Sequence, residues 1–360
     1  MYNYNGERWR IAVVKWTEDD EIAAAIHHEL GCLGYHPTVF PSNSIIPEGQ
    51  DVVFSFAPYG QFFPLVRQLE ELPAEKQPLL VHWNTEGLPD LRIPWFLTKA
   101  IGAGRSWLDR YRLNAERRSS PEPAKKSLLS FLDSRVLRFR YVGDYDYAFR
   151  KGVLSVLSDS SALYSELRRR HGLPTLYAPW GSSPRWYADL QLERDIDVLW
   201  MGNRQGTRRR LLIDRVREAL RRQGVEIYMA DNEENPFIFG EERTQFLNRA
   251  KITLNFTRTW YDDNFSRFTF AAPNRSLIVS EKMLPHCPAF EAGVHYVEGA
   301  AEDLASAIMF YLQHPAERAR IVENAYRLTT SYLTLNNTMK TIMSEVEQVR
   351  YTQSLTRSLT

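Results

Sequence analysis

Cysteine is scarce in this chain of 360 residues, which contains only Cys32 and Cys287. Neither belongs to a metal-ligand motif, and two isolated cysteines do not build the disulfide framework of a small secreted domain. Long apolar runs are also missing, since none approaches the ~20 residues that a membrane-spanning helix needs. The N-terminus has no apolar signal core. We therefore expect a reduced, soluble, cytoplasmic protein with no membrane span.

An excess of charge of one sign is also absent, because 45 Lys and Arg residues are balanced by 44 Asp and Glu residues. This balance gives no broad positive field for a polyanion, although a local patch is compatible with it. One patch suggests a nucleic-acid-binding helix through its arginines, which are Arg208, Arg209, Arg210, Arg215, Arg217, Arg221 and Arg222. Helical spacing spreads them around the helix and interleaves Asp214 and Glu218, which favours a solvated helix face.

What the chain does have is a regular alternation of short apolar runs and longer amphipathic stretches. Hydrophobic residues make up 44% of it, which suits two α/β domains of about 170 residues each. In the first half, the pattern predicts buried strands at 11–14, 51–56, 79–82, 136–142, 152–157 and 176–178. It predicts helices at 17–33, 62–72 and 162–170. Residues 110–126 combine charge with serine and proline, which is typical of a surface loop.

Proline, glycine and serine cluster at 179–184, which indicates an interdomain linker. The pattern then restarts, with strands expected at 197–201, 225–229, 252–256 and 277–279. Helices are expected at 207–222, 241–250, 301–313, 315–330 and 337–354. Such alternation predicts parallel sheets with helices on both faces.

The segment from Lys251 to Glu281 is the most informative part of the chain. Its two apolar strands each end in polar residues, and a helix can begin near Ser266 between them. Parallel strands bring their carboxyl ends to one rim of a sheet, so Asn255, Arg267 and Glu281 are expected to lie together there. In open α/β sheets this rim binds ligands.

This segment resembles glycosyltransferases with the GT-B fold, in the group 1-like branch that includes the CgeB-type spore-maturation proteins. The residues that match the family pattern are Lys251, Ile252, Leu254, Asn255, Arg267, Ala271, Ala272, Ser280 and Glu281. Two positions depart from it. Phe270 stands where the family usually has a glutamate that holds the donor ribose, and Arg275 stands where it usually has glycine.

The resemblance implies an α/β fold of two doubly wound Rossmann-like domains facing a cleft. An acceptor-side domain is expected at 1–180 and a nucleotide-sugar-binding domain at 181–335. A C-terminal helix at 336–360 is expected to cross back to the first domain. The family motifs cover roughly 195–335, whereas the first half resembles the family only in its alternation.

The turn after the strand at 197–201 is a candidate diphosphate site. Gly202 and Asn203 precede a helix start, where glycine permits close backbone approach and free N–H groups attract phosphate. Arg204 and Arg208 could add charge-assisted hydrogen bonds. The alternative is an ordinary strand-to-helix turn with solvated arginines.

Arg267 is the strongest single candidate, because a fixed guanidinium stabilises the charge that builds on a departing diphosphate. The alternative is a salt bridge to Asp262, Asp263 or Glu281. Glu281 could accept hydrogen bonds from a ribose or sugar hydroxyl, or it could cap the next segment. The resemblance adds further donor-binding candidates, which are Tyr228, Asn255, Phe270 and Arg275.

In the first half, polar residues follow the strand at 79–82. His82 or Glu86 could act as the general base that takes a proton from an acceptor hydroxyl. Alternatively, His82 is a satisfied strand-end histidine and Glu86 forms an N-cap or a salt bridge. Asp144, a third catalytic candidate, is expected at a comparable strand end. GT-B-like enzymes generally need no metal, so we assign none.

Three functions follow from these patterns. The first is a glycosyltransferase that moves a sugar from a nucleotide-diphosphate sugar, such as a UDP- or GDP-sugar, to an acceptor hydroxyl without another cofactor. The acceptor could be a glycan, a small molecule, a protein or a modified DNA base. The second is a catalytically inactive relative that serves as a binding or scaffold protein, suggested by Phe270 and Arg275. The third is a nucleic-acid-binding protein, suggested by the arginine-rich helix. We adopt the first.

Overall fold

The computed structural model describes residues 8–56, 62–116 and 137–358. Most of the expected loop at 110–126 lies outside these ranges. The chain divides into two units. The first comprises Met1–Ser160, Tyr164–Ala178 and Met339–Thr360, and the second comprises Ser161–Leu163 and Pro179–Thr338.

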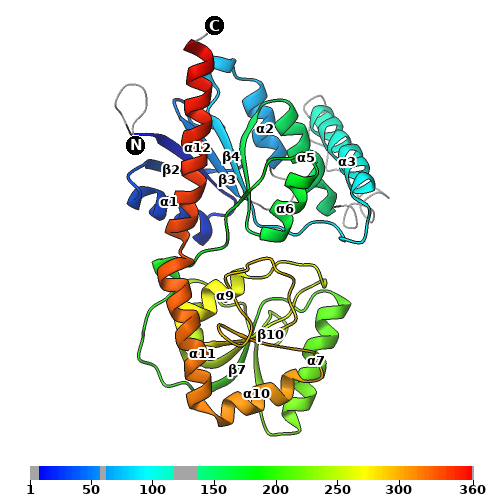
Figure 1. Cartoon of the computed structure of the whole chain (residues 1–360), viewed down its shortest axis with the longest axis vertical. Helices are drawn as coiled ribbons and strands as arrows, with labels where there is room; N and C mark the ends of the chain where they lie inside the picture. The colour runs from blue at the N-terminus through cyan, green and yellow to red at the C-terminus, as the bar shows by residue number, and fades with distance from the viewer. Residues whose placement is uncertain (1–7, 57–61, 117–136, 359–360) are drawn as a thin grey trace. The chain divides into compact units, whose positions relative to one another are not determined.

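The first unit contains a six-stranded parallel sheet in the order β2-β1-β3-β4-β5-β6 (Figure 1). Its strands are β1 (Arg10–Lys15), β2 (His36–Pro41), β3 (Val52–Phe56), β4 (Leu79–Asn84), β5 (Leu154–Asp159) and β6 (Leu176–Tyr177). Its helices are α1 (Glu21–Cys32), α2 (Phe62–Glu70), α3 (Trp95–Glu116), α5 (Arg140–Arg150), α6 (Ala162–Arg170) and most of α12 (Leu335–Ser358). β3 and β4 are buried at every position, as expected for central parallel strands covered on both faces.

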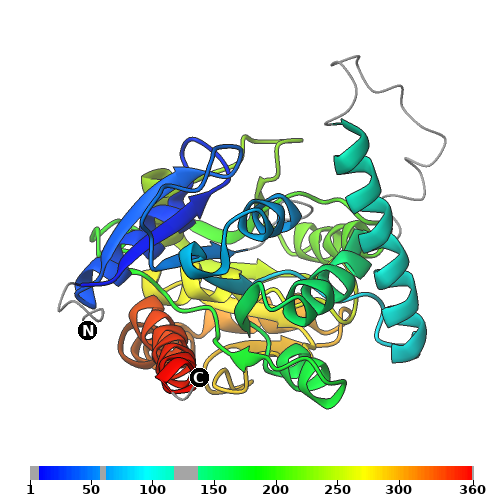
Figure 2. The same cartoon turned by 90° about the horizontal axis from the view of Figure 1, so that it is seen from above.

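One expected strand is wrong. Residues 136–142 alternate apolar and polar side chains, but the described part forms a 3₁₀ turn at Leu137–Phe139 and the start of α5. The apolar pattern continues through Tyr145 and Ala148, and these residues are buried on one stripe of the helix. This stripe has the helical period, which outweighs the short alternation. Figure 2 shows α3 lying beside α5.

The second unit contains a five-stranded parallel sheet in the order β11-β10-β9-β7-β8. Its strands are β7 (Ile196–Met201), β8 (Ile227–Ala230), β9 (Ala250–Asn255), β10 (Leu277–Glu281) and β11 (Val297–Gly299). Its helices are α7 (Thr207–Arg221), α8 (Gly240–Arg249), α9 (Ser266–Ala271), α10 (Leu304–Gln313) and α11 (Pro315–Arg327). Short turns at Pro184–Trp186 and Ala272–Asn274 are 3₁₀ helices, and Leu328–Tyr332 is a π-helix.

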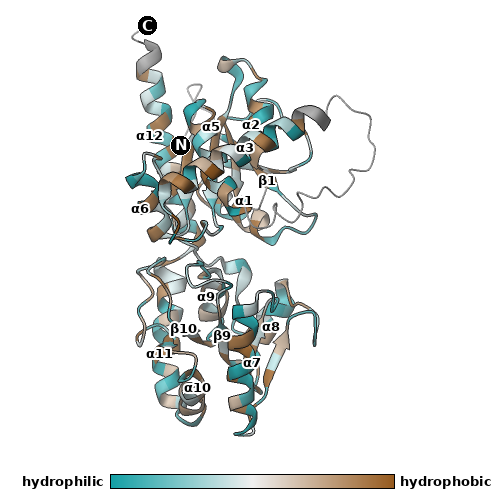
Figure 3. Cartoon of the chain, turned by 90° about the vertical axis from the view of Figure 1, so that its right-hand side faces the viewer, coloured by the Kyte–Doolittle hydropathy of each residue, from teal (hydrophilic) through white to brown (hydrophobic). Residues whose placement is uncertain are grey.

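Apolar cores cover both faces of this second sheet. Successive residues of a strand point to opposite faces, so Val198 and Trp200 enter one core while Leu199 and Met201 enter the other. Helices α7 and α10 complete the first core, and α8, α9 and α11 contribute to the second. Figure 3 shows the hydropathy of these elements. Within the described ranges, no helix is both long and apolar enough to cross a membrane.

The chain enters the second unit and leaves it through two neighbouring passages. Ser182 and Thr334 form an isolated parallel bridge. The Ser182 N–H donates to the Leu333 carbonyl at 2.8 Å, and the Leu335 N–H donates to the Ser182 carbonyl at 2.7 Å. Gly181 has no room for a β-carbon, which would lie 2.2 Å from the carbonyl carbon of Thr334. The two passages are therefore hydrogen-bonded side by side.

Candidate functional site

The strand order of the second unit locates its ligand rim. β7 is the first strand of the second unit along the chain, and its neighbours β8 and β9 lie on opposite sides of it. The connections therefore leave β7 in opposite directions, and ligands of open α/β sheets bind at the carboxyl ends beside such a switch point. Gly202 follows β7 and Asn255 ends β9 at this place.

Arg267 reaches this switch point from α9. Its Nη1 donates to Asn255 Oδ1 at 2.7 Å, and its guanidinium lies 4.6 Å from the centre of the Trp200 ring. Asn255 Oδ1 also accepts from Asn264 at 3.0 Å. A β-carbon on Gly202 would lie 3.2 Å from Arg267 Nη2. Thus the guanidinium lies directly beside the turn that follows β7.

Arg267 has no salt bridge to a carboxylate among the described residues, so the expected alternative partners do not neutralise it. Burial, followed by the neighbouring charge of Arg209, lowers its pKa to about 9. Arg209 itself is 6% exposed, and burial and the charge of Arg258 lower its pKa to about 10 against the opposing effect of the Asp262 and Glu281 carboxylates. Two poorly solvated cations side by side are unfavourable unless an anion joins them.

The start of α7 adds backbone donors at the same place. Gly202 and Gly206 have φ of 116° and 96°, a region that favours glycine. Gly206 is the N-cap of α7, and no side chain caps its first N–H groups. Asn203 stabilises the turn, because its carbonyl and its Oδ1 accept from Arg209 at 3.1 and 3.3 Å. A helix start of this kind attracts phosphate.

Arg208 and Glu281 also meet at this rim, but they bind each other. Arg208 Nη1 lies 3.1 Å from Glu281 Oε1, and its Nη2 pairs with Oε2. The same carboxylate accepts from the backbone and hydroxyl of Thr257 at 2.7 and 2.9 Å. Glu281 therefore positions Arg208 and the loop after β9, and it is not a free acceptor for a ribose hydroxyl.

Arg204 and Tyr228 both make contacts within the protein. The Arg204 guanidinium faces three carboxylates of the loop after β8, those of Asp231, Glu233 and Glu234. Its Nε lies 2.6 Å from Asp231, so its charge is satisfied within the protein. Tyr228 packs against Phe246 of α8, with ring centres 4.9 Å apart. The carboxylates thus occupy the Arg204 guanidinium, and the donor-binding role of Tyr228 stays a prediction.

The arginine-rich helix α7 is mostly paired with acids. Its pairs are Arg210–Glu233, Arg217–Glu234, Arg221–Glu226 and Arg222–Glu218. The sequence predicted that the arginines of α7 lie on a solvated helix face, and this prediction is wrong for Arg209, which is buried. Its buried companions Ile213, Val216 and Leu220 have helical spacing, so the apolar stripe of α7 includes this arginine. That spacing is the signal that could have revealed Arg209, whereas Trp200 has the pattern of any apolar strand residue.

Comparisons with known proteins identify this unit. Residues 204–344 match the family model described as glycosyl transferase-like. Most of the second unit is therefore similar to glycosyl transferase-like proteins. None of the curated proteins compared with the chain matches it. The finer resemblance to CgeB-type proteins stays a prediction.

Solved structures extend the fold to the whole chain. Sucrose-phosphate synthase from Thermosynechococcus elongatus is 10% identical, with a TM-score of 0.58 over 96% of this chain and 100% of that one. HepE of Anabaena, in complex with UDP and glucose, is 12% identical, with a TM-score of 0.55 over 96% of this chain and 100% of that one. The pneumococcal O-GlcNAc transferase GtfA, in complex with UDP and GlcNAc, is 10% identical. Its TM-score is 0.51 over 82% of this chain and 57% of that one. The predicted GT-B fold is confirmed.

Phe270 replaces the glutamate of the family pattern, and it lies in an aromatic environment. Its ring contacts Trp186 edge to face at 5.0 Å, and the Arg243 guanidinium lies 3.8 Å from its centre. Such stacking fixes the start of the domain against α9. Phe270 therefore supplies packing where the family pattern has a carboxylate.

Arg275 departs for a different reason. It follows the 3₁₀ turn that extends α9 and has φ of 59°, the left-handed conformation in which helices commonly end at glycine. Its side chain turns to α11, pairs with Glu323 and lies 3.7 Å from the Tyr326 ring centre. Arginine is less favourable than glycine in this backbone conformation, but it adds two side-chain contacts that glycine cannot make.

Replacing Arg275 separates these two contributions. R275A loses both contacts and keeps a β-carbon in the left-handed region, whereas R275G loses the contacts and relieves the strain. We expect R275G to be about 1 kcal/mol more stable than R275A. Urea unfolding of both variants measures the difference, and equal stabilities would contradict a backbone role.

In the first unit, His82 is enclosed. It is 1% exposed, and its Nδ1 and Nε2 lie 2.7 and 2.8 Å from the hydroxyls of Ser55 and Tyr145. Burial lowers its pKa to about 3, and Arg168 contributes. This geometry is that of a satisfied core histidine. Glu86 lies half-buried just beyond β4, so its role as a base stays a prediction.

Asp144 is not at a strand end, because residues 140–150 form α5. It is 4% exposed, and burial raises its pKa to about 7. The carboxylate lies between α5 and α3, near Arg105 and Arg140. Its expected strand-end position is therefore wrong, and it belongs to the packing of two helices.

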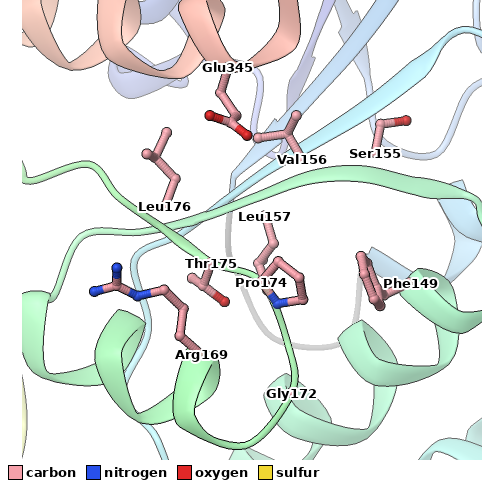
Figure 4. A pocket seen from close by; sticks show the side chains of 10 residues that line it. All are labelled: Phe149, Ser155, Val156, Leu157, Arg169, Gly172, Pro174, Thr175, Leu176 and Glu345. Carbon is pink, nitrogen blue, oxygen red and sulfur yellow. The ribbon is translucent and has the colours of Figure 1, made fainter. Parts of the chain in front are cut away.

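Two pockets lie in the first unit. One of about 770 Å³ lies at the carboxyl ends of β1 and β2 and is lined in part by Lys15, Trp16 and Ser42. The other, of about 490 Å³, is lined by β5, α6, the loop before β6 and α12 (Figure 4). The first has the position of a ligand rim. Among the described residues, no cluster of three or more His, Cys, Asp or Glu side chains could hold a metal, and metal independence stays a prediction.

Proposed function

We propose that this protein is a glycosyltransferase that moves a sugar from a nucleotide-diphosphate sugar to an acceptor hydroxyl. The observation that carries the proposal is the pair of poorly solvated arginines, Arg267 and Arg209, beside the turn after β7. Arg267 has no ion-pair partner among the described side chains, and Arg209 Nε is buried without a hydrogen-bond partner. A diphosphate supplies the missing negative charge and acceptor oxygens.

In the proposed reaction, the acceptor oxygen bonds to the anomeric carbon while the bond from that carbon to the diphosphate breaks. Negative charge grows on the departing diphosphate, and Arg267 stabilises it from a fixed position on Trp200 and Asn255. The N–H groups at the start of α7 hold the same phosphates. Arg208, positioned by Glu281, lies near enough to this rim to turn toward the donor.

UDP is the first nucleotide to test, because HepE and GtfA both have UDP in their structures. We expect UDP at saturating concentration to raise the melting temperature by about 5 °C, since a ligand at 100 times its Kd stabilises by about 2.7 kcal/mol. Uridine, which lacks the diphosphate, is the matched control and should give no shift. GDP is measured in parallel. The absence of a shift with every nucleoside diphosphate would overturn the proposal.

Phe270 favours a second candidate, a relative that binds a nucleotide without turnover. Phe270 stands at the family position that holds the ribose, so this position carries no carboxylate here. The Phe270 ring is instead packed against Trp186 and Arg243. Release of UDP from UDP-sugars distinguishes the two functions. A melting shift with UDP and no release from any donor would support the second candidate.

A further inference from the structure

Helix α3 has its apolar side chains on the outside. Between Trp95 and Leu113, its exposed residues are Phe96, Leu97, Ala100, Ile101, Ala103, Gly104, Trp107 and Tyr111. None of them is charged. A surface helix ordinarily has the opposite pattern, with apolar residues toward the core and charges toward water. We call these residues the α3 apolar face. Figure 3 views the molecule from the side that carries α3.

Lys99, Arg105 and Asp109 of α3 are directed toward α5. Arg105 and Asp109 are buried and pair at 3.2 Å, and Arg140 of α5 approaches the same carboxylate at 2.6 Å. Lys99 pairs with Asp146 of α5 at 3.8 Å. Because these charges are satisfied against α5, the outer side of the helix is left to apolar residues.

The α3 apolar face is large enough for a specific contact. Phe96, Trp107 and Tyr111 are 70%, 59% and 62% exposed, and the last two rings stack at 5.9 Å. Aromatic side chains cover 150–250 Å² each, so the whole face offers roughly 600 Å². Patches of this size on a monomer commonly mark an interaction site. Two such faces in contact would bury about 1,200 Å², the lower limit for a stable protein interface.

We propose that the α3 apolar face binds the same face of a second copy of this chain. The sequence of the face is self-complementary if the two helices run antiparallel about a two-fold axis near Ile101. Phe96 of one copy then meets Trp107 of the other, and Ala100 meets Ala103. Small residues at the centre let the helix backbones approach, and the aromatic rings close both ends.

A second copy fits this face better than a membrane surface does. Helices that lie on membranes carry Lys and Arg beside their apolar stripe, where these residues reach the lipid head groups. In α3, Lys99 and Arg105 pair with carboxylates instead, and the Arg110 guanidinium lies 4.1 Å from the Tyr147 ring centre. These three cations therefore contact protein groups, and the face itself presents apolar surface.

Sedimentation of the full chain over a range of micromolar concentrations tests the proposal. We expect the wild type to be a dimer and A100E to be a monomer, because a carboxylate at the centre would be buried without a partner. Its dissociation constant should rise about 100-fold or more. I45E is the matched control, since Ile45 is 86% exposed in the same unit but outside α3. It should remain a dimer. A wild type that stays monomeric, or an A100E variant that still dimerises, would overturn the proposal.

Cross-linking gives an independent measurement. In a C32S background, which removes the exposed native thiol, oxidation of I101C should yield a covalent dimer, whereas I45C should not. A cooperative melting transition and an unchanged far-UV circular dichroism spectrum of A100E show that its fold is intact, while its melting temperature should fall below that of dimeric I45E. If monomeric wild type instead sediments with anionic vesicles and W107E does not, the face binds lipid and the dimer is excluded.

Discussion

R267A is expected to abolish the melting shift caused by UDP and to lower kcat/KM by about 10²- to 10³-fold, the usual effect of removing one group that stabilises a developing anion. Stability should change little, because the variant also removes a poorly solvated cation beside Arg209. Affinity for UDP in the wild type should fall as the pH rises through about 9, since Arg267 then loses its proton. Titration calorimetry at several pH values measures this.

R222A is the control for R267A. Arg222 follows α7 in the same unit, and its pair with Glu218 is largely exposed. Removing it changes the net charge equally but leaves the rim intact, so UDP should bind as it does to the wild type. If both variants lose affinity to the same extent, general electrostatics and not the position of Arg267 controls binding.

G143A is expected to lower the free energy of unfolding by about 3 kcal/mol or more. A β-carbon on Gly143 would lie 2.0 Å from the Gly102 carbonyl oxygen and 2.3 Å from its carbon. Both are backbone atoms of α3, so the clash is relieved only if α3 and α5 separate, and separation exposes the buried pairs of Arg105 and Asp109. Overpacking of this kind is costly. Chemical denaturation measures the loss.

G31A is the matched control. Gly31 also lies in a helix, but the nearest atom to its added β-carbon is 4.0 Å away. Alanine should stabilise α1 by about 0.5–1 kcal/mol, because glycine is a poor helix former. If G143A were as mild as G31A, the close contact between α3 and α5 would not exist in solution.

The strands and the rim of the second unit could be predicted because buried parallel strands are continuous apolar runs. The rim follows from strand order, so Asn255, Arg267 and the turn at Gly202 were found together. The orientation of Arg204 could not be predicted. It depends on Asp231, which ends a different strand, and no local pattern records which acid an arginine will reach.

In the first unit, too, polar residues find partners that are distant in the sequence. His82 is satisfied by Ser55 from β3 and Tyr145 from α5, two elements distant in the sequence. Asp144 lies on a helix because the apolar stripe through Tyr145 and Ala148 outweighs the brief alternation at 136–142. Long-range partners decide whether a polar residue is catalytic or structural, and only the fold supplies them.

The bridge between Ser182 and Thr334 makes the second unit an insertion with adjoining ends. Apart from Ser161–Leu163, that unit is one continuous segment, Pro179–Thr338, whereas the first resumes at Met339. If this segment were expressed alone, its two ends would therefore lie next to each other. A short glycine spacer from Ala178 to Met339 would rejoin the remainder, and nucleotide titration of the two products would locate the binding unit.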